Sequence, residues 1–105
     1  MSTFSVSTAI LDAIVLSLAR HQDIYGYMLT QEIQKVFPVS ESTLYPVLRR
    51  LQKNHCLNSY DSPCMGRNRR YYRITKTGVE TLEQYQNEWS KYKQQIDYFL
   101  KEETK

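Results

Sequence analysis

Six large apolar side chains recur near the C-terminal end of the chain at alternating spacings of three and four residues: Leu82, Tyr85, Trp89, Tyr92, Ile96 and Phe99. This a/d repeat predicts one helix of about 25 residues, roughly 38 Å long, with a coiled-coil seam along one side. Such a helix on its own would expose more apolar surface than a monomeric protein normally does. We therefore expect residues 77–105 to form a dimerisation helix with these six side chains at the interface. The alternative is that this helix folds back onto the first helix of its own chain.

Three shorter segments with helical periodicity precede the seam. Ser7 can cap a first helix at residues 8–20, and residues 25–37 form a second helix that Pro38 terminates. A third helix starts from a cap at Ser40 or Ser42, and Pro46 falls in or just after its first turn, where a missing N–H costs least. The expected buried stripes are Ile10, Leu11, Ile14, Val15 and Leu18 in the first helix, Met28, Leu29, Ile33 and Val36 in the second, and Leu44, Val47, Leu48 and Leu51 in the third.

The period changes between the third helix and the last one. Residues 56–62 and 69–75 are rich in Tyr, Ile and Leu and predict two strands, joined by a turn at residues 62–68. Three helices followed by a hairpin is the order of a winged helix-turn-helix. The expected fold class is therefore mainly α with a small β-hairpin (α+β): a winged helix-turn-helix domain at residues 1–76 and the dimerisation helix at 77–105. The helix at 8–20 is expected to contribute to the dimer as well.

Basic residues are concentrated in one part of this 105-residue chain. Residues 40–76 hold eight lysines and arginines against two acidic residues, whereas the whole chain carries a net charge of only +3. A compact basic segment in an otherwise acidic chain is typical of a polyanion-binding surface. The sequence shows no phosphate-binding glycine loop, metal-ligand spacing or nucleophile paired with histidine, so we expect neither an enzyme nor a cofactor. It also lacks a long apolar run and a signal-peptide pattern, which predicts a cytoplasmic protein that does not contact membranes.

The outer face of the third helix and the hairpin carry the candidate DNA-binding residues. If the apolar stripe of the third helix faces inward, its outer and lateral positions are Ser42, Thr43, Tyr45, Pro46, Arg49 and Lys53. Small hydroxyls at a helix N-terminus can approach phosphates closely, and arginine reaches base edges or phosphate oxygens. Arg67, Arg69 and Arg70 are crowded into the predicted turn, where their mutual repulsion has no folding benefit and an anion would relieve it. We expect the helix in the major groove of a duplex and the arginines along its backbone or minor groove.

The residues of this region carry a resemblance to a known family. The segment STLYPVLRRL at 42–51, followed by GRNRRYYRITKTG at 66–78, resembles the PadR family of bacterial transcriptional regulators, and YGYMLTQEI at 25–33 resembles the opening of its second helix. The resemblance implies a homodimeric repressor on a palindromic operator of double-stranded DNA, released by a small molecule or a stress signal. It also implies that Tyr27 lies at the duplex. The chain departs from the family pattern at Ser42 and His55, where glycine is common, and at Asn68, where proline is common. His55 would then close the third helix in a left-handed conformation, unless Asn54 takes that turn.

Trp89 is the only tryptophan of the chain, and two interpretations of its role are open. It is either a plain residue of the dimer core or part of an effector site, because paired indoles across a dimer axis can hold a planar ligand between them. The segment NEWSKYKQQI at 87–96 resembles the matching helix of a multidrug-binding regulator of the same family, with Lys93 where that regulator has an acidic residue. The expected effector is therefore a planar neutral or anionic molecule that binds near Trp89, Lys93 and Val15.

Three alternatives remain open. Cys56 and Cys64 could form a thiol-based redox sensor, although an extended strand would hold them apart. The same cysteines with His55 could bind zinc, although their spacing matches no established pattern. A winged helix can also bind a protein instead of DNA, in which case the arginine-rich hairpin would require an acidic partner.

Overall fold

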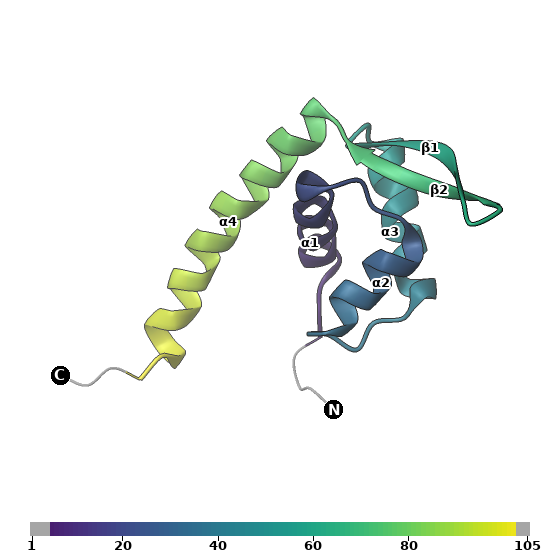
Figure 1. Ribbon diagram of the computed structural model, residues 1–105. Helices are drawn as coiled ribbons and strands as arrows, with labels where there is room; N and C mark the ends of the chain where they lie inside the picture. The colour runs from purple at the N-terminus through teal and green to yellow at the C-terminus, as the bar shows by residue number, and fades with distance from the viewer. Residues whose placement is uncertain (1–4, 103–105) are drawn as a thin grey trace.

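The structure is a computed structural model that describes residues 5–102 (Figure 1). Three short helices come first: α1 (Thr8–His21), α2 (Gly26–Gln34) and α3 (Glu41–Lys53). A hairpin of β1 (Leu57–Cys64) and β2 (Arg67–Ile74) follows, and the long helix α4 (Lys76–Leu100) ends the described chain. The three short helices are grouped together, the hairpin projects to one side, and α4 extends away on the other side. The expected α+β winged helix-turn-helix with a long C-terminal helix is confirmed.

One hydrophobic core holds the three short helices, the base of the hairpin and the start of α4 together. It is made of Leu11, Val15, Leu16, Ala19, Ile24, Leu29, Ile33, Leu44, Val47, Leu48, Leu51, Cys56, Leu57, Tyr72 and Leu82. All four apolar residues expected on the inner stripe of α3 are buried, which leaves the other sides of that helix exposed. Burial of this stripe is the main reason why α3 forms, because isolated helices of its length are marginal in water.

The hairpin is longer and tighter than the sequence predicted. Its turn consists of only Met65 and Gly66, whose φ angles of 53° and 81° are both positive, as in the two-residue turns that match the twist of a hairpin. The strands pair antiparallel from Leu57 opposite Ile74 to Cys64 opposite Arg67. The expected placement of three arginines in a turn was therefore wrong, because all three lie on β2. Ile24, in the loop before α2, pairs with Tyr72 and covers the other edge of β2.

Helix α2 ends three residues before the predicted position. A proline disfavours helical geometry in the residue before it, and Pro38 thereby forces the chain to leave the helix ahead of Phe37. The amides of Val36 and Phe37 both bond to the carbonyl of Ile33 in a closing turn. Val36 is consequently 74% exposed, and the prediction that it belongs to the buried stripe was wrong.

The residue that follows the end of α3 and the residues that begin α4 each have a specific backbone requirement. His55 closes α3 in the left-handed region with φ 64°, while Asn54 has φ −87° and does not take that role. Thr75 caps α4 by accepting a hydrogen bond from the amide of Gly78, at 2.9 Å from its hydroxyl. A Cβ on Gly78 would lie 2.3 Å from the carbonyl oxygen of Cys56, so only glycine allows this close approach.

Helix α4 changes character along its length. Leu82 is 1% exposed and belongs to the core of its own chain, so its expected place in the dimer seam is corrected. Tyr85 is half-buried against the same core. Beyond it, the apolar residues Trp89, Tyr92, Ile96 and Phe99 are exposed to solvent. The repeat of six residues therefore serves two purposes: Leu82 and Tyr85 anchor α4 to its own protomer, and the other four residues form an uncovered apolar face.

Candidate nucleic-acid interface

The N-terminus of α3 presents a cluster of hydroxyl groups. Ser40 precedes the helix in an extended conformation, and its Oγ lies 2.9 Å from Ser42 Oγ and 3.1 Å from Thr43 Oγ1. All three residues are exposed. Because the first amides of a helix lack intrahelical acceptors, hydroxyls at this end lie where a phosphate is favoured. The structure thus exposes Ser42 and Thr43 as expected, and it adds Ser40, which sequence reasoning considered only as a cap.

Tyr45 joins the second and third helices at the exposed surface. Its ring lies against Gly26 at the start of α2, where an added Cβ would come within 2.7 Å of the phenol oxygen. Its hydroxyl donates to Glu41 Oε2 at 3.1 Å. Burial of the ring and this carboxylate raise the pKa of Tyr45 above its ordinary value. Next to it, Tyr27 is 59% exposed and its hydroxyl accepts a hydrogen bond from Gln31. The Tyr45 ring thus lies against Gly26, the residue next to the exposed Tyr27 at the start of α2.

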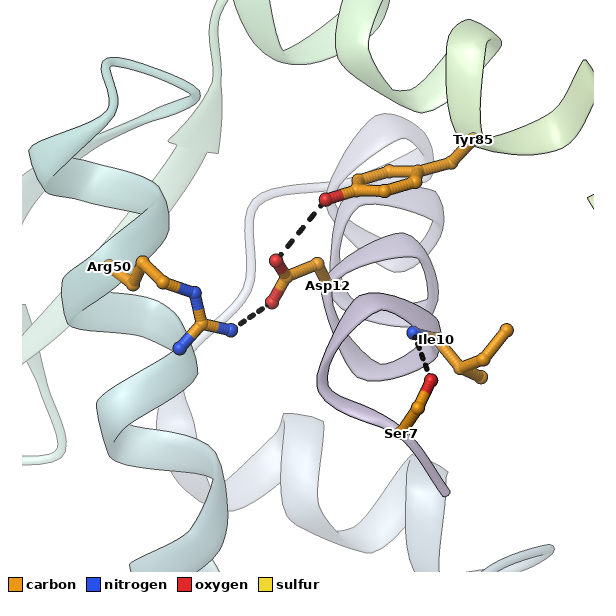
Figure 2. Close-up of polar contacts among 5 residues, drawn as sticks. All are labelled: Ser7, Ile10, Asp12, Arg50 and Tyr85. Atoms are coloured by element: carbon orange, nitrogen blue, oxygen red, sulfur yellow. Dashed lines mark hydrogen bonds and ion pairs between the residues drawn. The ribbon is translucent and has the colours of Figure 1, made fainter. Parts of the chain in front are cut away.

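The two adjacent arginines of α3 point in different directions. Arg49 is exposed and has no carboxylate partner among residues 5–102, so its charge is available to a ligand. Lys53, at the end of the helix, is also exposed, as is Pro46 in its second turn. Arg50 instead turns toward the protein interior and forms an ion pair with Asp12 of α1 (Figure 2).

The three arginines of the wing, which we define as β1, β2 and their turn, differ in how they are held. Arg67 is exposed beside the turn. The guanidinium of Arg69 lies 4.1 Å from the ring centroid of Tyr25, which is a cation–π contact. Arg70 forms a cross-strand ion pair with Asp61, with Nε and Oδ1 3.3 Å apart. An exposed pair of this kind contributes little to stability, so Arg70 can exchange its partner for a phosphate at small cost.

A row of aromatic rings supports Arg69 on one face of the wing. Tyr71 stacks on Tyr60 at 5.5 Å between centroids, and its other side meets the edge of Tyr25 at 5.3 Å. Sequence reasoning noted the tyrosine-rich strands but did not find this stack, because it depends on the loop before α2. The rings hold β2 against that loop and so fix the wing relative to the helices.

A polar cluster centred on Asp23 continues the same face. Its carboxylate accepts hydrogen bonds from the hydroxyl of Tyr60 and from Arg73 Nη2, the latter at 3.1 Å. The bond from Tyr60, followed by the bond and charge of Arg73, lowers the pKa of Asp23 below its ordinary value, although burial opposes them. Arg73 is thus held by the protein, while Arg49, Arg67 and Arg69 have no carboxylate partner among the residues that the structure describes.

A groove of about 760 Å³ runs between α1 and α4, away from the basic surface. Its walls include Ile10 and Ala13 of α1 and Tyr85, Trp89 and Tyr92 of α4. Two of the three expected effector residues do not line it. Val15 is completely buried in the core, which corrects its expected role, and Lys93 lies on an exposed side of α4, whereas Lys91 does line the groove.

The two cysteines lie near opposite ends of β1. Cys56 is buried before β1, and its thiol lies 3.7 Å from Thr81 Oγ1. Cys64 lies at the opposite end of β1, beside the turn. Since a disulfide requires Cα atoms within about 7 Å of each other, the strand between them prevents a bridge within the chain. Within residues 5–102, no group of three histidine, cysteine or acidic side chains could hold a metal ion.

Comparison with known proteins agrees with this geometry. Residues 15–84 match the Transcriptional regulator PadR-like family. The chain belongs to the PadR family. It resembles smu.1704 from Streptococcus mutans UA159, with a TM-score of 0.89 and 34% identity over 99% of this chain and 98% of that one. A PadR family transcription regulator from hypervirulent Clostridium difficile R20291 has a TM-score of 0.79 and 29% identity, over 86% of this chain and 97% of that one. Transcriptional regulator Rv3488 of Mycobacterium tuberculosis is 39% identical over 69 residues, which are 65% of this chain and 64% of that protein.

Membership of the PadR family decides the class of function. The chain is a transcriptional regulator and not an enzyme, and regulators of this family bind DNA and are generally dimeric. Among the described helices, none has a stretch that is both long and apolar enough to cross a membrane.

Proposed function

We propose that this PadR protein is a homodimeric repressor that binds a palindromic operator in double-stranded DNA. The observation that carries the proposal is the division of each protomer into two surfaces: a basic surface on α3 and the wing, and an aromatic face on α4. Arg49, Arg67 and Arg69 have no carboxylate partner in the described chain and lie on the elements that a winged helix-turn-helix applies to DNA.

In the proposed complex, each contact has a distinct role. Helix α3 enters the major groove, where Ser42, Thr43 and Tyr45 approach the backbone or base edges and Arg49 reads a base or binds a phosphate. Lys53, Tyr27 and Pro46 lie at the margins of this contact. Arg67, Arg69 and Arg70 bind along the backbone and minor groove from the wing.

The aromatic face of α4 supports the dimeric state. Trp89, Tyr92, Ile96 and Phe99 leave between 38% and 81% of their surface exposed in the protomer. Helix α4 of a second copy would cover them, with the exposed parts of α1 contributing to the same interface; residues 103–105 of the predicted dimerisation helix lie outside the described residues. The DNA-binding surfaces of the two protomers would then face half-sites about one turn of DNA apart, roughly 34 Å.

The groove between α1 and α4 supports a small-molecule signal that releases the repressor. Trp89 and Tyr92 offer aromatic surfaces to a planar ligand, and Lys91 in the same wall favours a neutral or anionic one. Because α4 also carries the proposed dimer interface, a ligand in this groove would alter the relative position of the two DNA-binding surfaces.

The test of DNA binding is a fluorescence titration with a duplex from the region upstream of the gene, at two salt concentrations and against scrambled competitor. We expect tight, salt-sensitive binding that prefers the upstream duplex, because neutralised phosphates release counterions. The variant Arg67→Ala/Arg69→Ala/Arg70→Ala should lose most of this affinity while remaining a dimer.

A matched control has the same loss of three positive charges elsewhere. The variant Lys35→Ala/Lys93→Ala/Lys101→Ala removes three exposed lysines, one just after α2, one on α4 and one just after α4, all outside the proposed DNA-binding surface. It should retain nearly all of the affinity. Equal losses in both variants would mean that net charge alone drives binding, and the wing would lose its assigned role. Absence of any duplex preference would instead point to a winged helix that binds an acidic protein.

A further inference from the structure

Asp12 is a buried acidic side chain in the second turn of the apolar helix α1. It is 7% exposed, and its two oxygens are divided between two other helices. Oδ1 accepts from Arg50 Nη2 of α3, and Oδ2 accepts from the hydroxyl of Tyr85 of α4 at 3.3 Å. Figure 2 shows the carboxylate between these two donors, with Arg50 on one side and Tyr85 on the other. One carboxylate thus joins the helix proposed to read DNA to the helix proposed to form the dimer.

The contact is directional in a way that the surrounding apolar packing is not. Apolar side chains tolerate small sliding movements, whereas a charged hydrogen bond weakens steeply when its distance or angle changes. Releasing either donor would also leave a carboxylate in the interior with an unmet requirement for hydrogen bonds, which is unfavourable. The three side chains therefore favour one orientation of α3 relative to α4.

Tyr85 also belongs to a second surface. Its ring forms part of the wall of the groove between α1 and α4, next to Trp89. Burial, followed by the negative charge of Asp12, raises the pKa of the Tyr85 hydroxyl, which stays protonated and remains a donor at neutral pH. A ligand or partner that packs against this part of the groove would touch a residue that is one hydrogen bond away from Asp12 and two contacts away from α3.

We propose that Asp12 is a positioning residue that transmits the state of the α4 face and its groove to α3 through Tyr85 and Arg50. This proposal rests on the proposed function, since it assumes that α3 binds DNA. It assigns opposite roles to the adjacent arginines of α3: Arg49 binds the duplex, and Arg50 holds the helix that binds it. Sequence alone could not separate them, because both are basic residues of one helix.

The salt dependence of DNA binding distinguishes the two roles. Each phosphate contact that is lost reduces the slope of log K against log salt by about 0.9. Arg49→Gln should therefore weaken binding and reduce the slope by about this amount. Arg50→Gln should weaken binding on the order of tenfold, as expected for loss of coupling through a packed network, without a change in slope. A slope that falls equally in both variants would show Arg50 to be a phosphate contact and would overturn the proposal.

A compensating variant guards against a general loss of folding. Arg50→Gln alone leaves Asp12 without its cationic partner, whereas Asp12→Asn/Arg50→Gln restores a neutral pair of amides that can bond to each other and leaves the net charge unchanged. If positioning is the role of Arg50, the double variant should recover part of the affinity that Arg50→Gln loses. If Arg50 touches DNA, the double variant should bind no better than the single one.

The link to α4 is tested by Tyr85→Phe, which removes one hydroxyl and keeps the ring in the groove. We expect a loss of duplex affinity of several-fold with an unchanged slope, and an unchanged dimer in sedimentation equilibrium. Wild-type affinity in this variant would break the connection between α4 and Asp12 and refute transmission. The wild-type titration is the reference for all variants. If it shows no salt-sensitive binding to the duplex, the proposed function fails. If wild-type binding is normal and the slope of Arg50→Gln falls by about 0.9, only the role of Asp12 is overturned.

Discussion

Replacing Trp89 with alanine should dissociate the dimer while leaving the protomer folded. Trp89 is 49% exposed in the protomer. An aromatic side chain of its size has up to ~250 Å² to bury, so about 120 Å² remains for a partner to cover. At ~25 cal/mol per Å², that surface is worth about 3 kcal/mol in each protomer and about 6 kcal/mol in a symmetric dimer. Since alanine keeps part of this contact, the dimer dissociation constant should rise by about 10³- to 10⁴-fold.

Sedimentation equilibrium over a wide range of protein concentration measures this change directly. The matched control is Asn87→Ala, which alters an exposed position of α4 that does not line the groove. It should leave the dissociation constant within about twofold of wild type, as expected for surface substitutions. The circular dichroism of the Trp89→Ala monomer should retain the helical content of the protomer. A Trp89→Ala dimer as tight as wild type would refute the assignment of the α4 face to a second copy.

Three further changes test the fold. Gly78→Ala places a Cβ against the carbonyl of Cys56, and it should lower the free energy of unfolding by about 2–3 kcal/mol in urea titration, the cost of an overpacked site. His55→Gly removes the backbone strain of a non-glycine residue in the left-handed region, and it should raise the free energy of unfolding by about 0.5–1 kcal/mol. His55→Ala keeps a Cβ and should not raise it. Asp23→Asn should be less stable than wild type at neutral pH. Folding lowers the pKa of Asp23, so its carboxylate stabilises the folded protein at pH values above its ordinary pKa of 3.8. That difference should shrink as the pH falls below 3.8, and a constant difference down to pH 2 would contradict it.

Hydrophobic periodicity predicted the number and order of the elements because burial of apolar stripes is what forms them. It predicted α3 well, since all four of its apolar positions face the core. It failed at Val36, where the backbone requirement of the following Pro38 outweighed the pattern. It also failed to separate Leu82 from Trp89, because a repeat shows which side chains share a face but not whether that face meets its own chain or another one.

The candidate site was predictable in its residues but not in its contacts. The exposed positions of α3 follow directly from the stripe that it buries, so Ser42, Thr43 and Arg49 could be named in advance. The inward turn of Arg50 could not, because it depends on Asp12, which is distant in sequence. A signal for Asp12 was nevertheless present: it is the only charged residue within the otherwise apolar first turns of α1, where a carboxylate needs a buried partner.

The connection between the wing and α4 consists of one residue. β2 ends at Ile74, α4 begins at Lys76, and Thr75 between them donates to the carbonyl of His55 at 2.6 Å while capping α4. A joint this short has no slack, and a residue inserted in the first turn of α4 would rotate the rest of the helix by about 100° around its axis and turn its aromatic face away from the partner. Relatives that recognise operators of different spacing are therefore expected to differ in the length or curvature of α4 and to keep this joint unchanged.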